Sequence, residues 1–399
     1  MTFVRILSLP ILFYLLVFIV GCKNNGGIKN DSTIVSYMPI DSLTLKLTSL
    51  DTFQIKDFLI GDYTDYQVIS DSEKDILIGI NARDHGLDFI DLTNKVSQKQ
   101  IKFQSYGPDG ILGQIDGFYY HNPDTIFVLT IDENRIYVMT EGGEKIDYYD
   151  FNNIPLPDGF DNYDVYADIG IQNGPYYNVK NRTLQFYTYR WLSGRKNDFS
   201  FKTFASYSIE DKEFKSIYGN YPEVYKRGRN YLIYNDPSLV VVDSLSYVFF
   251  GVSDLIYCYN NNNGELLNII KHHCEHWRGT PDALKITADF QQGEDWLVSN
   301  SAYVFLLHDD INDQFFRFLK HEQPVSNLQG LINPRWLGEW CIEIFNQAMK
   351  PVGHYEIAAN TLLPAMSFVN DGKMWIKNPT PRVLENQSLY YQFKIDEKN

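Results

Sequence analysis

The sequence predicts an all-β protein folded as a single β-propeller. Short runs of β-branched and aromatic residues, bounded by Gly, Asn, Asp or Pro, follow one another from residue 43 onward. Such runs are typical of strands joined by tight turns. They recur in groups about 50 residues apart, which is within the range of propeller blades. The same region shows no sustained helical period, which disfavours folds that alternate strands with long helices.

The composition excludes several other classes of protein. With 44% hydrophobic residues in a chain of 399, the protein is too apolar to be disordered, and four cysteines are too few for a disulfide scaffold. The 50 acidic residues outnumber the 35 basic ones, for a net charge of −15. Because an acidic surface repels phosphate, we expect no nucleic-acid partner.

Residues 1–21 predict a lipoprotein signal peptide. Arg5 is followed by an apolar run over residues 6–20, and then by Gly21 and Cys22. This pattern is typical of a secretory signal, and the run is shorter than the ~20 apolar residues of a membrane-spanning helix. Residues 19–22 resemble a bacterial lipobox, which implies that the Cys22 thiol carries lipid and that the chain is cut before it. An uncleaved anchor and an ordinary secretory cleavage stay open as alternatives.

Residues 22–42 predict the lipidated cysteine and a flexible tether. The stretch after Cys22 is rich in Asn and Gly, which favours a flexible chain. Lys23 follows the cysteine where an Asp would signal retention, so by resemblance to lipoprotein sorting rules we expect the outer membrane. No acidic cluster follows either, which favours the periplasmic face over the cell surface. The expected partner of this segment is the membrane itself, through the lipid.

Residues 43–399 are expected to form the propeller domain, and residues 115–150 show its repeated unit best. Four strand-like runs, at 115–120, 125–129, 135–139 and 145–149, are separated by short turns rich in Asn, Asp and Gly. Four strands in about 35 residues predict an up-and-down antiparallel sheet, which is the repeat of a propeller blade.

Less regular units of the same kind are expected at 66–103, 165–217, 239–270, 285–320, 336–357 and 364–395. This count favours seven blades, and six larger blades fit almost as well. The runs 43–47 and 52–56 are expected to pair with the run 389–395, so that strands from both ends of the chain close the ring and hide an open edge. The few helical candidates are short, such as residues 281–285. No linker divides the chain after residue 45, which disfavours two separate β-sandwiches.

Two segments carry a family resemblance. A Gly-Pro-Asp-Gly turn occupies residues 107–110, and the run Gly-Phe-Tyr-Tyr-His-Asn-Pro-Asp-Thr-Ile-Phe occupies residues 117–127. Together they resemble a family of uncharacterised Gram-negative lipoproteins that carries a domain of unknown function. The resemblance implies a propeller of the TolB-like or NHL type and an envelope location. It gives no catalytic residue to carry over, because the family has no assigned function.

The segment 271–278 contains the best metal-ligand candidates of the sequence. It places His272, His273 and His276 beside Cys274 and Glu275. Imidazole, thiolate and carboxylate are the groups that bind zinc or copper. However, the segment lies between blades rather than on a helix, and structural zinc normally draws its ligands from two separated clusters. A connecting loop without a metal is therefore the favoured interpretation, and we expect no cofactor.

Other polar and aromatic clusters have simpler interpretations. The acidic stretches 158–164, with Asp168 beyond, and 308–313 could offer oxygen ligands to calcium, but they lack the spacing of an EF-hand and are expected to be turns. The aromatic stretches 189–191 and 336–340 could stack on sugars, but packing between blades is favoured. Residues 321–325 begin a zinc-protease pattern and do not complete it.

Three cysteines remain after Cys22 is assigned to lipid. Cys258 and Cys341 lie in strand-like runs and are expected to be buried as small apolar residues, and Cys274 is the third. An odd number of cysteines leaves at least one thiol unpaired. A disulfide is compatible with the sequence but not required by it.

Two functional hypotheses follow from these features. The favoured one is a lipid-anchored envelope propeller that binds another envelope protein, a peptide or a glycan without chemistry of its own. The alternative is an enzyme, a glycan-active hydrolase or lyase with its site at the mouth of the propeller channel. No catalytic residue can be named, because propeller enzymes assemble their sites from single residues on separate blades.

The lipid anchor is directly testable. Replacing the acylated thiol in Cys22→Ser should release the protein from the membrane into the soluble fraction, because lipid chains hold by roughly 0.8 kcal/mol per buried methylene. Fractionation followed by immunoblotting measures this. Membrane association that survives the substitution would contradict a lipid anchor at this position.

Overall fold

The computed structural model describes residues 34–36, 42–54, 63, 65–71, 74–155, 166–168, 174–189, 199, 202–226, 229–285, 288–379 and 387–397. All of these belong to the compact unit Ser32–Asn399. The predicted signal peptide, the lipidated Cys22 and most of the tether lie outside the described residues, so these predictions and their boundaries stay predictions. Among the described residues, no helix is long and apolar enough to cross a bilayer.

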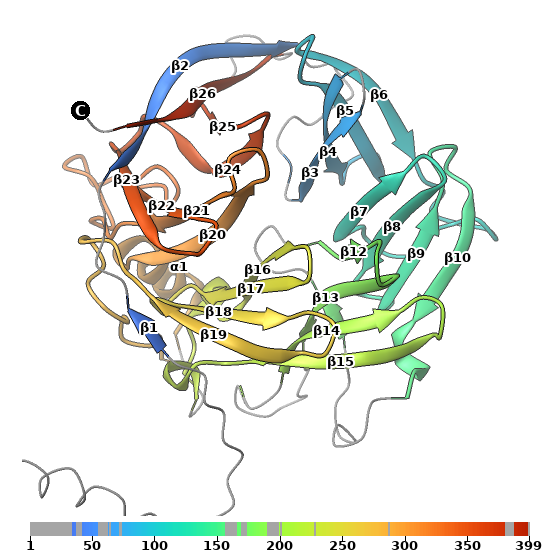
Figure 1. Ribbon diagram of the computed structural model, residues 1–399. Coiled ribbons are helices and arrows are strands. Elements are labelled where there is room, and N and C mark those ends of the chain that lie inside the picture. The colour runs from blue at the N-terminus through green and yellow to red at the C-terminus, as the bar shows by residue number, and fades with distance from the viewer. Residues whose placement is uncertain are drawn as a thin grey trace, which may run out of the picture. The chain divides into compact units, whose positions relative to one another are not determined.

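The described strands form small antiparallel sheets arranged around a ring (Figure 1), so the all-β, propeller-like prediction is confirmed. The first two sheets follow the chain without interruption. They comprise β3 (Tyr66–Asp71), β4 (Lys74–Asn81), β5 (Gly86–Asp91) and β6 (Val96–Lys102), and then β7 (Gly117–Asn122), β8 (Thr125–Thr130), β9 (Arg135–Met139) and β10 (Lys145–Asp150).

The next two groups carry additional strands. The third comprises β11 (Tyr166–Asp168) and β12 (Tyr176–Asn178), which both pair with β13 (Thr183–Tyr189), followed by β14 (Lys202–Ser208) and β15 (Glu213–Asn220). The fourth comprises β16 (Pro237–Val242), β17 (Leu245–Phe250), β18 (Leu255–Asn260) and β19 (Glu265–Lys271), with β1 (Ile34–Ser36) added in parallel to β19.

The last two groups complete the ring. The fifth comprises β20 (Ala302–Asp309), β21 (Gln314–Lys320), β22 (Trp340–Asn346) and β23 (Pro351–Ile357). The sixth comprises β24 (Leu363–Asn370), β25 (Lys373–Lys377), β26 (Gln387–Glu397) and β2 (Leu43–Gln54). Short 3₁₀ helices, η1 (Phe151–Asn153), η2 (Glu223–Tyr225) and η3 (Leu232–Asn235), and the helix α1 (Phe290–Ser299) lie in the connections.

The described strands therefore fall into six groups of four or five strands, and the favoured count of seven blades is not confirmed. The difference arises within one group, because the predicted units 285–320 and 336–357 are two halves of the sheet β20–β23. The connection 321–339 between β21 and β22 is long enough to have separated these halves in the sequence. The unit 285–320 also contains α1, which was not predicted from the sequence, whereas the predicted helical candidate 281–285 is not helical.

The helix α1 is short but has a strong start signal. Asp289 accepts a hydrogen bond from the backbone N–H of Gln292, and the Gln292 side chain accepts one from the backbone N–H of Asp289. This reciprocal capping box satisfies amide groups that the first helical turn leaves without partners.

The predicted pairing of the chain ends is confirmed. Strand β2 runs antiparallel to β26 over its whole length, from Leu43 opposite Glu397 to Gln54 opposite Gln387. It also meets neighbouring sheets at its two ends, where Leu43 pairs with Gly353 of β23 and Gln54 with Val96 of β6. A Cβ atom at Gly353 would lie 2.0 Å from the backbone oxygen of Leu43, so only glycine permits this close approach.

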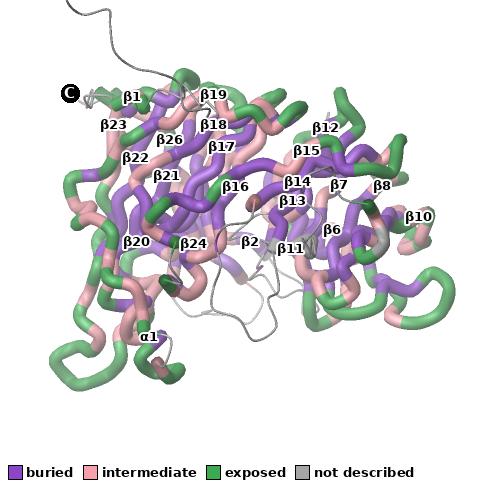
Figure 2. The backbone as a smooth tube through the Cα atoms, turned by 90° about the horizontal axis from the view of Figure 1, so that it is seen from below, coloured by how far each residue is buried: buried purple, intermediate pink, exposed green. Residues whose placement is uncertain are grey.

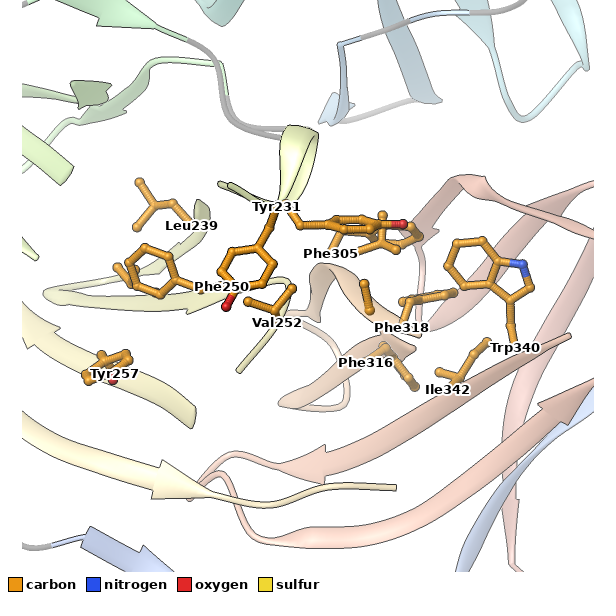
Figure 3. Packing of buried hydrophobic residues seen from close by; sticks show 14 of the residues in the cluster. Tyr231, Leu239, Phe250, Val252, Tyr257, Phe305, Phe316, Phe318, Trp340 and Ile342 are labelled. Atoms are coloured by element: carbon orange, nitrogen blue, oxygen red, sulfur yellow. The ribbon is translucent and has the colours of Figure 1, made fainter. Parts of the chain in front are cut away.

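Aromatic residues pack sheet against sheet, as the sequence predicts. Tyr247 of β17 and Phe315 of β21 have ring centroids 4.8 Å apart, and Phe127 of β8 lies 4.9 Å from Tyr177 of β12. Figure 3 shows part of the largest cluster, in which aromatic and aliphatic side chains from the fourth and fifth groups gather. Figure 2 shows that buried residues follow the strands, while exposed residues concentrate in the turns.

The closing ladder can be tested with two residues that face each other across it. Phe393 of β26 is buried against Tyr355, whereas its partner Leu47 of β2 is half exposed. Phe393→Ala should lower the free energy of unfolding by about 3–5 kcal/mol, because it leaves a cavity in the core. Leu47→Ala should cost less than about 1 kcal/mol. Urea unfolding measures both, and equal losses would contradict this packing.

Candidate functional site

The segment 271–278 follows β19, and the structure separates its three histidines. The ring of His272 is nearly buried, and its Nδ1 lies 2.8 Å from Oε1 of Glu343 on β22. His273 is half exposed and lies 3.6 Å from the carboxylate of Asp254. His276 packs against His321, with ring centroids 4.6 Å apart. The predicted trio of metal-ligand candidates is therefore not one cluster.

His272 belongs to a buried ion-pair network. Arg317 of β21 donates from Nε to Oε2 of Glu343 at 2.7 Å and from Nη2 to the backbone oxygen of His272 at 2.5 Å. The Arg317 guanidinium also lies 3.8 Å from the centre of the Tyr303 ring. Burial alone would raise the pKa of Glu343, but Arg317 and His272 hold it below its ordinary value. Both carboxylate oxygens of Glu343 are therefore occupied by protein groups.

A second cluster lies beside this network. The ligand atoms of Cys274, His321 and Glu356 all lie within 4.8 Å of one another, and they come from three separate elements. Cys274 follows β19, His321 follows β21 directly, and Glu356 is on β23. His276 lies next to these residues, since its Nε2 is 3.5 Å from Oε1 of Glu356. We call these four residues the Cys-His-Glu cluster.

The cluster combines buried and exposed groups. Cys274 and His321 are buried, whereas Glu356 and His276 reach solvent. Burial and the neighbouring His276, Lys320 and Arg278 lower the pKa of His321 to about 4, which leaves its imidazole neutral near pH 7. The Nε2 atom of His321 is buried without a hydrogen-bond partner.

The thiol of Cys341 on β22 also reaches this region. Its sulfur lies 2.6 Å from that of Cys274. The contact with Cys274 and burial together raise the pKa of Cys341 well above its ordinary range. The prediction that Cys258 and Cys341 are buried is confirmed, and Cys274 is buried as well.

Two pockets are lined by candidate residues. One of about 230 Å³ is bordered by His272, His273, Cys274 and Glu343 together with Gly353 and His354. The other, of about 660 Å³, lies between the sheets β3–β6 and β7–β10 and includes Lys99, Tyr120 and Glu141. In the second pocket, Lys99 forms an ion pair with Glu141, which also accepts a hydrogen bond from the Tyr120 hydroxyl at 2.6 Å.

The family-like run 117–127 has a structural role beside this second pocket. It forms β7 and the start of β8, and Phe118 and Tyr120 are buried. The backbone N–H of Phe118 donates to the Asp65 carboxylate at 3.0 Å, and that of Tyr120 donates to the Gln67 side chain at 2.7 Å. These bonds join β7 to the preceding sheet. Burial raises the pKa of Asp65 to about 7, and nothing in the sequence marks this residue as unusual.

The remaining sequence candidates have structural explanations or lie outside the described residues. Asp309 accepts hydrogen bonds from the backbone N–H groups of Ile311 and Asn312 and so stabilises the turn between β20 and β21. Trp340 is buried and stacks on Trp336, as packing predicts. The stretches 158–164 and 190–191 and the side chain of Asp168 lie outside the described residues.

The ring of small antiparallel sheets defines the class of this protein as propeller-like and all-β. The profile of the domain of unknown function DUF4221 matches residues 42–330. The chain belongs to this family, which confirms the resemblance seen in the sequence to a family without an assigned function.

Two solved structures share the fold. A member of the DUF4221 family from Bacteroides vulgatus is 16% identical, covers 90% of this chain and 99% of its own, and has a TM-score of 0.75. A protein from Bacteroides fragilis thought to be exported is 10% identical, covers 92% of this chain and 100% of its own, and has a TM-score of 0.53. No curated protein matches the sequence. At these identities the likeness supports the fold alone.

The buried network gives a testable prediction about stability. Arg317→Met should lower the free energy of unfolding by about 3–5 kcal/mol, because the Glu343 charge would stay buried without its cation. The double variant Arg317→Met with Glu343→Gln should recover part of this loss. As a control, Arg182→Met breaks an exposed ion pair with Glu210 and should cost less than about 1 kcal/mol. Denaturant unfolding measures these variants together with Glu343→Gln alone. A double variant as unstable as the sum of the Arg317→Met and Glu343→Gln variants would contradict the coupling.

Proposed function

We propose that the protein is a lipid-anchored envelope protein that binds a protein partner through an exposed apolar hairpin. The lipobox at Cys22 supports export and anchoring. The structurally similar protein from Bacteroides fragilis is thought to be exported, which is consistent with an envelope location for this chain. The sorting pattern after Cys22 favours the periplasmic face of the outer membrane.

The observation that carries the proposal is the hairpin at residues 324–334, in the connection between β21 and β22. Its apolar side chains Leu328, Leu331 and Ile332 are 102%, 66% and 56% exposed. Soluble proteins rarely expose neighbouring large apolar residues without a use for them. Each could contribute roughly 1.5–3 kcal/mol if a partner buried it fully.

The hairpin is an ordered turn. Ser326 and Ile332 form an antiparallel bridge, and the N–H of Asn327 donates to the oxygen of Leu331 at 2.8 Å. The Asn327 side chain accepts from the N–H of Leu331 at 3.0 Å, and Gly330 takes a φ of 77° that glycine adopts freely. The apolar side chains are thus held in a fixed arrangement, which reduces the entropy lost on binding.

The base of the hairpin is fixed to α1. Lys320 is buried and its Nζ donates to the backbone oxygens of Val298 and Asn300, at 3.1 and 2.9 Å. These carbonyls lie at the end of α1, where a cation is favourable. Burial lowers the pKa of Lys320 to about 7. On the other side, Arg335 lies 3.6 Å from Glu294 of α1.

The position of α1 favours a protein partner over the membrane. Figure 2 shows α1 on one face of the ring and β1 on the other. β1 is the described element that follows Cys22 most closely in the sequence. The residues between them, 22–34, span at most about 40 Å when extended. With the chain entering the ring at β1, the opposite face, which carries α1, stays accessible to a protein partner. Nothing in the described residues favours the alternative, a glycan-active enzyme.

The proposal predicts that polar substitutions in the hairpin abolish a specific interaction. Leu328→Ser with Leu331→Ser should reduce cross-linking to an envelope protein by about tenfold or more, because two anchor side chains are lost. The thermal midpoint should not change, since both residues are exposed. The measurement is quantitative cross-linking in intact envelopes followed by mass spectrometry.

The matched control is Ile311→Ser, which removes an apolar side chain as exposed as Leu331 from a different turn and should leave the cross-links unchanged. Unchanged cross-links in the hairpin variant would contradict the proposal. So would a loss of membrane association, because that result would assign the hairpin to the bilayer.

A further inference from the structure

We propose that Cys274, His276, His321 and Glu356 form a zinc-binding site. The inference concerns the Cys-His-Glu cluster and is independent of the hairpin and of the lipid anchor. Of the histidines that the sequence marks, only His276 belongs to this site. The Nδ1 atom of His272 instead forms a hydrogen bond with Glu343, and His273 lies beside Asp254.

The chemistry of the four groups fits zinc. Thiolate, imidazole and carboxylate are its usual protein ligands, with bonds of about 2.0–2.3 Å. In a tetrahedral site such bonds place the ligand atoms about 3.3–3.8 Å apart. Cys274, His321 and Glu356 are already within 4.8 Å of one another, so a shift of about 1 Å would bring them to this geometry. Glu356 is partly exposed and has the freedom to make it.

His321 supplies the second observation that points to a ligand. Its Nε2 is buried and has no hydrogen-bond partner, while the nearest Glu356 oxygen lies 3.8 Å away. A buried polar atom without a partner is costly, and a metal ion in the cluster would remove that cost. The other ring nitrogen, Nδ1, lies 3.8 Å from the Glu339 carboxylate. A small movement of the exposed Glu339 side chain would let it accept a hydrogen bond from Nδ1, as carboxylates behind ligating histidines commonly do.

His276 completes the set. Its ring lies 4.6 Å from that of His321, and its Nε2 lies 3.5 Å from Glu356. Cys274 and His276 come from one loop, whereas His321 directly follows β21 and Glu356 is on β23. The ligands thus come from separated parts of the chain, an arrangement that residues 271–278 alone do not provide.

Cys341 determines how the site must be tested. Its sulfur lies next to that of Cys274, so a disulfide between the two would compete with the metal for the same atom. The mature protein is therefore purified in detergent, stripped with a chelator and kept reduced. Zinc is then added and counted by elemental analysis after gel filtration, and Co²⁺ is used as a spectroscopic probe.

We expect one zinc per chain and, with Co²⁺, a thiolate-to-metal charge-transfer band. His321→Gln and Cys274→Ser should each weaken zinc binding by about 100-fold or more, and Cys274→Ser should abolish the band. His276→Gln and Glu356→Gln, at partly exposed positions, keep the test valid if a core variant fails to fold. His273→Gln and Cys258→Ser lie outside the cluster and should bind as the wild type does.

Three results would overturn the site. One is a reduced protein that takes up less than one zinc per chain. Another is equal affinity in the wild type and the folded ligand variants. The third is a cobalt complex without the thiolate band.

Discussion

The ladder between β2 and β26 is the constraint on which the rest of the structure depends. Strand β2 comes from the start of the folded unit and completes a sheet whose other three strands come from its end. Its two ends also reach β23 and β6, so one strand joins its own sheet to two neighbouring sheets. Because each sheet is too small to bury its own apolar residues, closing the ring is what keeps the aromatic contacts between sheets out of water.

The fifth sheet accommodates an insertion without losing its strand pairing. The connection 321–339 leaves β21 and returns to β22, which still pair in register from Gln314 opposite Asn346 to Lys320 opposite Trp340. Within this connection, His321 contributes its side chain to the Cys-His-Glu cluster, and the hairpin 324–334 extends to the surface beside α1. One insertion thus serves both proposed sites, and Lys320 holds its start against the end of α1.

Local signals made much of the fold predictable. The strands within 115–150 follow because short turns such as Asp132–Asn134 separate them, and Asn134 takes the positive φ of 52° that Asn tolerates. The closing pair follows because both chain ends carry strand-like runs. The blade count does not follow, since the insertion 321–339 separates two hairpins of one sheet. Helix α1 was missed because its ten residues are too few and too polar to show a clear period.

The candidate sites were less predictable because they depend on contacts between distant residues. The sequence marks His276 through its neighbours, but His321, just after β21, and Glu356, on β23, are isolated residues. Only the order β21–β22–β23 in the sheet brings these two together. Arg317 and Glu343 look like ordinary strand residues, and their burial follows from register alone. The exposure of Leu328 and Leu331 could not be inferred either, because an apolar pair near a Gly is also common in buried turns.

The closing strand also determines the order in which the molecule can fold. Leu43 pairs with Glu397, so the ladder can form only after almost the whole chain has been synthesised. Contacts between such distant residues slow folding, and until they form, β2 presents an unpaired edge with Leu45 and Phe53 uncovered. Unpaired edges of this kind promote aggregation. The interval between the synthesis of β2 and that of β26 is therefore the period in which this chain most needs protection by a chaperone.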